Sequence, residues 1–363
     1  MVKRFESLDA FRGLCAISVV VFHMHLVGSI TELSFFRGSA IFVEFFFVLS
    51  GFVLAHGYGF RNDLMFKPFV KARFFRLFPL HIFMLGVMIV LEFGKLFAYK
   101  FAGFSFNNEP FTGPGAVSEI IPNLLLLQSW TPFTNPLTFN YPSWSISVEF
   151  YMYILLFISI CLFKGRKGLG WALVSLIMLY GIFVDSDTLT KEVFRGLSCF
   201  FGGAFMYTFY RKIEHLKLSF SFASIIEILS IFLVVYVVSS DFENRTICAI
   251  AMFFIIVTIF AFDSGVISYL LKKKPFQTAG KLSYSIYMIH AAFLFCLTSS
   301  VMVLQKVTGI EMAPMINGMR FLTIGDAWMN NILVFFIVGL VILASTFTYN
   351  FIELKGQQIG KRL

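Results

Sequence analysis

An arginine and a histidine lie inside the first apolar run of the chain, at a spacing that suits chemistry within a membrane. Arg12 and His23 are eleven residues apart, about three helical turns, so on one helix they project from the same face roughly 16 Å apart. Asp9 precedes Arg12 by three residues and is expected to pair with it. An imidazole at this depth is suited to moving a proton. Ionisable groups inside a membrane mark functional sites by default. The alternative is an orienting arginine plus a histidine that a neighbouring helix satisfies.

Two carboxylates are expected at a depth similar to that of His23. Glu44 and Glu149 each follow the outer end of an apolar run by six residues, roughly 9 Å along a helix, and His23 lies roughly 7.5 Å deep. His290 falls nearer the middle of a later run. Three different spans therefore bring Glu44, Glu149 and His23 to one level of the membrane, where each group needs a partner or a proton.

A basic, aromatic segment follows the second apolar run and forms the predicted cytoplasmic loop over residues 59–79. Arg73 and Arg76 are three residues apart and share a face if this segment forms a short interfacial helix. The planar fork of arginine is suited to phosphate. The alternative is a positively charged anchor that only orients the chain.

The composition indicates the elements that must position these groups. The chain has 363 residues, of which 58% are hydrophobic and 13% charged, too few polar residues for a soluble globule of this size. We predict an all-α, polytopic membrane protein that forms one transmembrane domain over residues 1–363. Ten spans are expected, at residues 10–28, 38–58, 80–98, 143–163, 169–184, 193–210, 218–239, 246–262, 282–304 and 331–351.

The distribution of lysine and arginine predicts the orientation, because cytoplasmic loops carry the excess. With the N-terminus inside, twenty basic residues lie on the inner side and eight on the outer side. Both termini are therefore expected in the cytoplasm, in a plasma (inner) membrane. The net charge of +9 is explained by this topology, so no nucleic-acid partner is implied. Asp9 and Arg12 interrupt the first apolar run, which is expected to be retained rather than cleaved as a signal peptide.

The remaining features limit the chemistry. The five cysteines lie in apolar runs without metal or disulfide spacing, so they are expected to be small buried side chains. No phosphate-binding loop, zinc motif or nucleotide fingerprint is present, and no metal site is expected. The longest outer loop covers residues 100–141, and its apolar piece at 120–130 is too short to span, so it is expected to be interfacial or re-entrant. Loops of this length usually carry function.

Five sequence blocks together resemble the integral-membrane acyltransferase 3 family. The blocks stand in the family's order and cover nearly the whole chain. They are Leu8-Asp9-x-x-Arg12-Gly13 with His23, Glu44-Phe-Phe-Phe-Val-Leu-Ser50-Gly51-Phe52, Arg73-x-x-Arg76-Leu77-x-Pro79, Trp144-Ser145-Ile-Ser147-Val-Glu149, and Ser283-Tyr284-Ser-x-Tyr287-x-x-His290.

The resemblance implies transfer of an acyl group, most often acetyl from cytoplasmic acetyl-CoA, to a sugar hydroxyl at or beyond the outer face. The acceptor would be a cell-envelope polysaccharide, of the O-antigen kind, or a lipid-linked glycan. The partners would be acyl-CoA, the glycan and membrane lipids, with no permanently bound cofactor. The family's Arg-x10-His pair corresponds to Arg12 and His23, and its basic motif to Arg73 and Arg76.

The implied mechanism uses His23 as a general base on the sugar hydroxyl or as a covalent carrier of the acyl group; the sequence leaves both open. Glu149 or Glu44 would orient the imidazole. Arg12, with the Arg73 and Arg76 pair, would bind the donor phosphates. A supporting or substrate-binding role is expected for Asp9, Glu44, Ser50, Trp144, Ser145, Ser147, Tyr287 and His290.

Two departures from the family and one rival function complete the prediction. The family commonly has Glu-Arg-Pro after the last span, whereas here Glu353 is followed by Leu354 and Lys355, which puts the usual turn in doubt. The chain stops at Leu363 without the extra hydrolase-like domain of some relatives, so a standalone form is expected. The rival is a proton-coupled sugar or lipid transporter or flippase, in which the same histidine and carboxylates form a proton relay.

Overall fold

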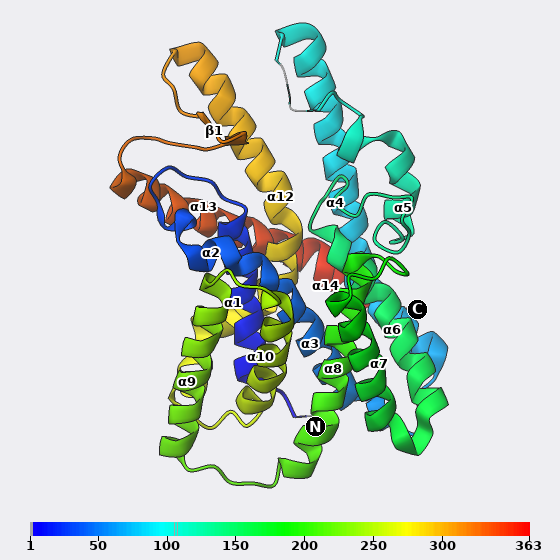
Figure 1. The fold of residues 1–363 in the computed structure, drawn as a ribbon. Coiled ribbons are helices and arrows are strands. Elements are labelled where there is room, and N and C mark those ends of the chain that lie inside the picture. The colour runs from blue at the N-terminus through cyan, green and yellow to red at the C-terminus, as the bar shows by residue number, and fades with distance from the viewer. Residues whose placement is uncertain (1–2, 105, 107) are drawn as a thin grey trace. The chain divides into compact units, whose positions relative to one another are not determined.

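The computed structural model describes residues 3–104, 106 and 108–363. Ser105 and Asn107, in the predicted outer loop, and Met1 and Val2 at the start of the predicted domain lie outside the described residues. The chain forms two compact units (Figure 1). Unit 1 comprises residues 1–49 and 209–347, and unit 2 comprises residues 50–208 and 348–363. The boundaries fall within the helices α3 and α8 and next to the end of α13.

Unit 1 is built from helices and one small hairpin. Its helices are α1 (Glu6–Phe22), η1 (Ile30–Glu32), α2 (Ser34–Gly38), η2 (Ser39–Ile41), the first part of α3 (Phe42–Leu54), the end of α8 (Lys191–Ile213), α9 (Phe220–Ser239), α10 (Arg245–Phe260), α11 (Val266–Leu271), α12 (Lys274–Thr308) and α13 (Ala327–Thr348). The strands β1 (Met315–Ile316) and β2 (Met319–Arg320) pair antiparallel.

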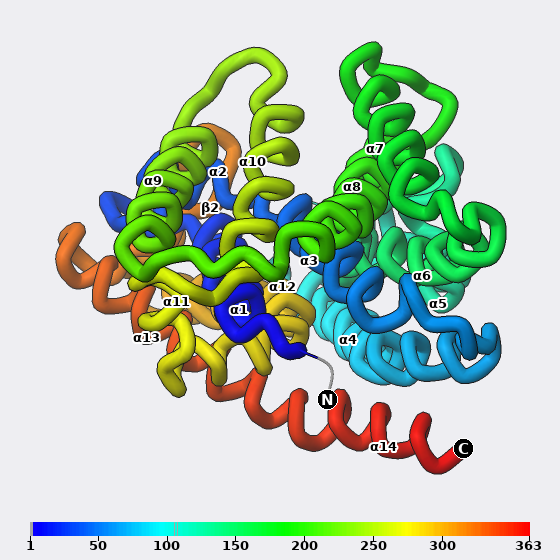
Figure 2. Tube along the Cα trace, turned by 90° about the horizontal axis from the view of Figure 1, so that it is seen from below, coloured from blue at the N-terminus to red at the C-terminus, as the bar shows by residue number. Residues whose placement is uncertain are grey.

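Glycines on facing surfaces let α1 and α12 approach closely (Figure 2). A Cβ atom added at Gly13 would lie 2.7 Å from the Cβ atom of Ala279, and one added at Gly280 would lie 2.7 Å from the backbone carbon of Asp9. Small residues at helix interfaces are typical of membrane proteins, where close contact replaces the hydrophobic drive to associate. The helix that carries Arg12 is therefore held at a fixed distance from the helix that carries His290.

We expect Gly280→Ala to destabilise the protein, because the added methyl group meets the backbone of α1 and not a flexible side chain. The cost should be about 1–3 kcal/mol, the usual range for overpacking, and should appear as a lower midpoint of thermal unfolding in detergent. Gly339→Ala is the matched control, since a Cβ atom there has nothing within 4 Å. Equal unfolding midpoints for the two variants would contradict the close contact.

Unit 2 contains the end of α3, a π-helical turn, η3 (Ala55–Gly59), and four long helices. These are α4 (Phe66–Ala102), α6 (Ser143–Phe163), α7 (Lys167–Phe183) and most of α8. The shorter elements are η4 (Gly113–Gly115), η5 (Val117–Glu119), α5 (Ile120–Leu124), η6 (Lys164–Arg166), the π-helical turn η7 (Tyr349–Glu353) and α14 (Leu354–Arg362). In Figure 1, α5 lies beside α4 within this unit.

The basic segment predicted as a cytoplasmic loop is mostly helical. Helix α4 begins at Phe66 and continues without interruption past Pro79, so Arg73 and Arg76 lie on its second and third turns rather than in a surface loop before a span. Its 37 residues measure about 55 Å, well beyond the ~30 Å of hydrocarbon. The helix is therefore long enough to extend beyond the hydrocarbon, and the two arginines lie in its N-terminal turns.

The C-terminal helix α14 packs against α4 through two glycines. A Cβ atom added at Gly356 would lie 2.6 Å from the Cγ atom of Pro79, and one added at Gly360 would lie 2.6 Å from the Cγ atom of Phe75. Glu353, where the sequence departs from the family pattern, is buried in η7. The chain does not turn there but continues from α13 through η7 into α14.

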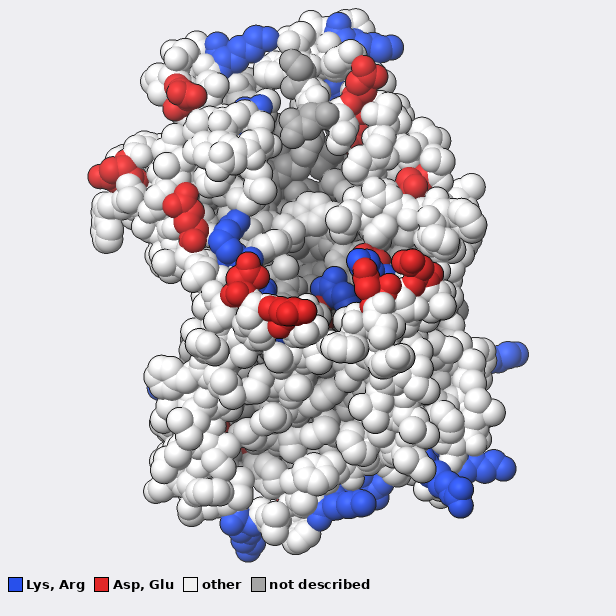
Figure 3. All heavy atoms as spheres, in the orientation of Figure 1, with Lys and Arg blue, Asp and Glu red and all other residues white. Residues whose placement is uncertain are grey.

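Among the described residues, six helices or continuous helical segments are long and apolar enough to cross a membrane. They cover Ser34–Gly59, Phe66–Ala102, Ser143–Phe183, Phe220–Ser239, Lys274–Thr308 and Ala327–Arg362, and a shorter apolar helix covers Arg245–Phe260. On the face drawn in Figure 3, most of the surface belongs to uncharged residues and the charged side chains lie in groups. The all-α membrane class is confirmed, whereas the count of ten spans stays a prediction.

The prediction of buried cysteines is right for two of the five residues. Cys15 and Cys199 are buried, as expected, but Cys161, Cys248 and Cys296 are exposed. Apolar runs do not bury every side chain in a membrane protein, because one face of a spanning helix faces lipid.

Candidate functional site

Two histidines from distant parts of the sequence stack in unit 1. His23 lies at the C-cap of α1 and His290 lies in α12. Their ring centroids are 5.2 Å apart, with an angle of 26° between the ring planes. His290 is fully buried and His23 is partly exposed. A residue predicted to do chemistry therefore has a second imidazole against its face.

The orientation of His290 is set by its own helix. Its Nδ1 atom lies 2.7 Å from the carbonyl oxygen of Tyr287, and since a carbonyl only accepts, Nδ1 carries the proton. In the neutral ring Nε2 is then the acceptor nitrogen. The ring of Tyr287 packs edge-on against Phe46 with centroids 5.9 Å apart. The block from Ser283 to His290 thus contributes an oriented imidazole and an aromatic wall.

Arg37 fixes the end of α1 next to His23. Its Nη2 atom donates to the carbonyl oxygens of Val21 at 3.1 Å and Met24 at 2.7 Å. Its guanidinium also lies over the ring of Phe22, 5.6 Å from the centroid. The last carbonyls of a helix have no partner within the helix, so a cation there stabilises the end. Arg37 positions the residue that follows Phe22.

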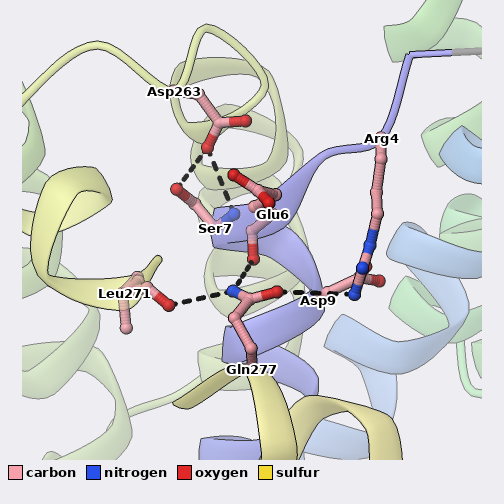
Figure 4. Close-up of polar contacts among 7 residues, drawn as sticks. All are labelled: Arg4, Glu6, Ser7, Asp9, Asp263, Leu271 and Gln277. Atoms are coloured by element: carbon pink, nitrogen blue, oxygen red, sulfur yellow. Dashed lines mark hydrogen bonds and ion pairs between the residues drawn. The ribbon is translucent and has the colours of Figure 1, made fainter. Parts of the chain in front are cut away.

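Asp9 belongs to a polar cluster at the start of α1 (Figure 4). Its partner there is Arg4, whose Nε atom lies 2.6 Å from the carboxylate. Asp263 accepts from the backbone N–H and hydroxyl of Ser7, and Gln277 of α12 donates to the carbonyl of Glu6 at 2.8 Å. This cluster holds the start of α1 in place, and it gives Asp9 an ion pair other than the predicted one with Arg12.

Arg12 and Glu44 also belong to unit 1. Arg12 lies partly exposed on α1, and Glu44 lies in the first turn of α3 with 1% of its surface exposed. A carboxylate this deeply buried is expensive unless it is paired or protonated. Of the two predicted partners of His23, Glu44 is the one in the same unit.

Glu149 accepts two hydroxyl hydrogen bonds in unit 2. The Oγ atom of Ser50 donates to its Oε1 atom at 2.7 Å, and the hydroxyl of Tyr153 donates to the same oxygen at 2.5 Å. Next to Ser50, a Cβ atom added at Gly51 would lie 2.7 Å from the carbonyl carbon of Phe200. Ser50 therefore binds a carboxylate, and Gly51 permits close packing of α3 against α8.

Arg73 lies between two tyrosines of unit 2. Its Nη2 atom donates to the hydroxyl of Tyr58 at 3.1 Å, and its guanidinium carbon lies 5.3 Å from the ring centroid of Tyr58 and 5.8 Å from that of Tyr153. Its Nε atom is buried and has no hydrogen-bond partner among the described residues. Arg76 follows three residues later on α4 and is partly exposed. A buried donor on an arginine suits an incoming anion.

The block from Trp144 to Ser147 attaches the outer loop to α6. Ser147 donates through Oγ to the carbonyl oxygen of Leu126 at 2.7 Å, and its own carbonyl accepts from the indole nitrogen of Trp130 at 3.0 Å. Ser145 donates to the carbonyl oxygen of Pro142 at 3.2 Å. The hydroxyls of both serines donate to backbone carbonyl oxygens. These bonds give the serines a structural role in holding the loop.

Trp144 carries a cation on its ring. The guanidinium carbon of Arg195, in α8, lies 5.0 Å from its ring centroid. The guanidinium of Arg195 therefore has an aromatic partner in unit 2.

The predicted site residues divide between the two units. Asp9, Arg12, His23, Glu44, Tyr287 and His290 lie in unit 1, and Ser50, Arg73, Arg76, Trp144, Ser145, Ser147 and Glu149 lie in unit 2. Within unit 1 the structure brings together His23 and His290. Within unit 2 a continuous set of contacts runs from Ser50 through Glu149 and Tyr153 to Arg73.

The sequence alone did not indicate three residues that contact the predicted site residues. Tyr153 follows Glu149 by four residues on α6, a spacing that places two side chains on one helix face and that would have found it. Tyr58 and Arg37 carry no local signal, because their partners lie elsewhere in the chain.

Comparisons with known proteins agree with this architecture. The apolar helices define an all-α membrane protein. Residues 5–350 match the acyltransferase family whose description is "Acyltransferase domain", and the chain belongs to this family. The resemblance predicted from the five blocks is confirmed.

Two curated relatives match parts of the chain. Acyltransferase MdmB from Streptomyces mycarofaciens is 32% identical over 170 residues, which cover 42% of this chain and 38% of the relative. Protein 2 in picA locus from Rhizobium radiobacter is 41% identical over 92 residues, which cover 24% of this chain and 44% of the relative. The matches thus span less than half of either relative. No solved structure matches the chain.

Proposed function

We propose that the chain is a membrane O-acyltransferase that moves an acyl group, most often acetyl, from cytoplasmic acyl-CoA to a hydroxyl of an envelope polysaccharide or lipid-linked glycan. The family match supports acyl transfer. The observation that carries the proposal is the stacked pair of His23 and His290 within apolar helices of unit 1. The neutral form of an imidazole carries an acceptor nitrogen that can take a proton from a hydroxyl.

In the proposed reaction His23 takes the proton of the sugar hydroxyl as its oxygen attacks the thioester carbonyl. The new C–O bond forms and the C–S bond breaks, and the resulting imidazolium returns the proton to the departing CoA thiolate. In a two-step variant the imidazole nitrogen attacks the thioester and the C–S bond breaks, so that CoA leaves as the thiolate. The sugar hydroxyl then attacks the acyl-imidazole, the C–N bond breaks, and the hydroxyl proton passes through the imidazole to the thiolate. His290 stacks against this ring and keeps it in place.

The donor is proposed to bind unit 2 through Arg73 and Arg76. Support comes from the buried Nε atom of Arg73, which has no hydrogen-bond partner among the described residues, and from the two tyrosine rings that hold this guanidinium. Charge-assisted hydrogen bonds to phosphate are among the strongest available to a protein.

Orientation is part of the same proposal. The excess of lysine and arginine in one set of loops supports cytoplasmic termini in a plasma membrane. The donor groups would then face the cytoplasm and the acceptor would arrive from outside.

The direct test is release of free thiol from acetyl-CoA by purified protein. We expect release that depends on envelope glycan prepared from cells lacking this gene. Thiol release without glycan would indicate hydrolysis, and absence of release together with proton-driven sugar uptake would favour a transporter.

We expect Arg73→Lys to raise the KM for acetyl-CoA by about tenfold with little change in kcat. Lysine keeps the charge but loses the fork that binds phosphate and stacks on tyrosine. Initial rates over a range of donor concentrations measure the effect. Lys212→Ala, at an exposed position of α8, is the control, because it removes a surface charge elsewhere in the chain. An unchanged donor KM in Arg73→Lys would favour a purely orienting role for this segment.

A further inference from the structure

A basic cavity of about 540 Å³ lies in unit 2 between η3, the loop after it and the turn from α6 to α7. This volume falls within the roughly 300–1,000 Å³ of small-molecule sites. Arg61, Lys164 and Lys167 line the cavity, and no acidic residue does. Phe60 and Phe157 supply aromatic walls. A small anion with an aromatic group fits such a lining.

The three cations of this cavity are not neutralised by carboxylates in the described part of the chain. None of them takes part in an ion pair there. Lys167 donates through Nζ to the carbonyl oxygen of Gly59 at 2.9 Å and lies 5.6 Å from the ring centroid of Phe60. Its position is therefore set by main chain and aromatic contacts, which leave its positive charge uncompensated.

Lys164 stands at a backbone position where glycine would be less strained. Lys164 has φ +41°, in the left-handed region that favours glycine, although Gly165 follows directly. A residue other than glycine in such a conformation costs of order 1–3 kcal/mol. Strained positions of this kind cluster at binding sites.

One tyrosine relates the cavity to the proposed donor site, because Arg61 of the cavity and Arg73 both contact its ring. The guanidinium carbons of Arg61 and Arg73 lie 5.2 Å and 5.3 Å from the ring centroid of Tyr58. From Lys164, α6 leads back to Tyr153 and Glu149 over 15 residues, roughly 22 Å along its axis. A ligand with an anionic end and a long arm would follow this path.

We propose that this cavity binds the 3′-phosphorylated adenosine end of acyl-CoA, with the diphosphate reaching Tyr58 and Arg73 and the pantetheine arm continuing toward Tyr153. The inference rests on the proposed function and adds a nucleotide subsite to it. Lys164, Lys167 and Arg61 meet the 3′-phosphate, and Phe60 or Phe157 meets the adenine. The aromatic walls favour a nucleotide over the phosphate of a lipid headgroup, which has no ring to stack.

Alkylation of Cys161 reports binding without activity. Cys161 lines the cavity and is exposed, as are Cys248 and Cys296 elsewhere. With the full chain in neutral nanodiscs, we expect adenosine 3′,5′-bisphosphate to slow maleimide labelling of Cys161 at least fivefold, with Cys248 and Cys296 unchanged. If phosphatidylglycerol nanodiscs protect Cys161 without nucleotide, and nucleotide adds nothing, the cavity binds lipid headgroups and the proposal fails. Absence of protection by either also overturns it.

Lys164→Gly tests the cation without threatening the fold, because glycine tolerates the observed backbone. We expect about tenfold weaker protection by adenosine 3′,5′-bisphosphate, a higher KM for acetyl-CoA, and no change in KM for acetyl-pantetheine, which lacks the nucleotide. Lys212→Ala is the control of equal charge loss. Equal KM changes for both donors would overturn the subsite.

The failure of this subsite and of the proposed function can be told apart. The subsite alone is rejected if the protein transfers acetyl from acetyl-CoA but nucleotide does not protect Cys161 and Lys164→Gly leaves the donor KM unaltered. Protection of Cys161 that Lys164→Gly weakens, without acyl transfer to any glycan, supports the nucleotide subsite and rejects the acyltransferase activity.

Discussion

His23→Ala should abolish acyl transfer while the protein remains folded and inserted. A positioned general base contributes about two to four orders of magnitude in rate, so the turnover should fall by at least a hundredfold. The fold should survive because His23 lies at the C-cap of α1 and is partly exposed, whereas the buried residues of α1 precede it. Thiol release from acetyl-CoA in the presence of glycan measures the loss, and the unfolding midpoint in detergent reports the fold.

His25→Ala is the matched control for this variant. His25 lies two residues further on. Its Nδ1 atom is 3.0 Å from the Nη1 atom of Arg37, and its ring packs against Phe321. It should keep most of the activity. Turnover of His23→Ala close to that of the unaltered protein would remove His23 from the mechanism, and equal losses in both variants would indicate damage to the end of α1.

Glu149→Gln should lower turnover by at least tenfold with little change in stability. The carboxylate accepts from Ser50 and Tyr153 through one oxygen, and Tyr153 in turn packs on Arg73. An amide keeps the shape but loses the negative charge that this set of donors and the nearby guanidinium favour. Initial rates with saturating donor and glycan measure the change.

Two further variants compare Glu149 with a hydrogen-bond partner, Tyr153, and with the other candidate carboxylate, Glu44. Tyr153→Phe removes one hydroxyl donor but keeps the ring under Arg73, so it should cost less than Glu149→Gln. Glu44→Gln tests the other candidate carboxylate, which is buried in the same unit as His23. If Glu149→Gln is silent and Glu44→Gln is not, Glu44 is the carboxylate that serves the imidazole.

The helices could be predicted where apolar runs have clear ends. The span predicted at residues 143–163 coincides with α6 (Ser143–Phe163), and the next is α7 (Lys167–Phe183) against a predicted 169–184. The start of α4 could not be predicted from hydropathy, because the charges of Lys67, Lys71 and Arg73 lower the hydropathy of this segment to that of a loop. Their helix is stabilised by tyrosines and by α14, which are distant in the sequence.

The candidate site could be predicted residue by residue but not as a set of contacts. Spacing within one helix relates Arg12 to His23, and it would have related Glu149 to Tyr153. The stacking of His23 on His290, the capping of α1 by Arg37 and the contact of Arg73 with Tyr58 join residues from separate elements. Periodicity describes one helix at a time, so these pairs required the fold.

The most direct test of the account uses proteoliposomes of defined orientation. Acetyl-CoA is supplied only on the side of the termini, and envelope glycan from cells lacking this gene only on the other side. We predict acetylated glycan in the acceptor compartment, detected by mass, with free CoA thiol appearing in the donor compartment, and neither product with His23→Ala. Acetylation that occurs only when donor and glycan share a compartment would contradict transfer across the membrane.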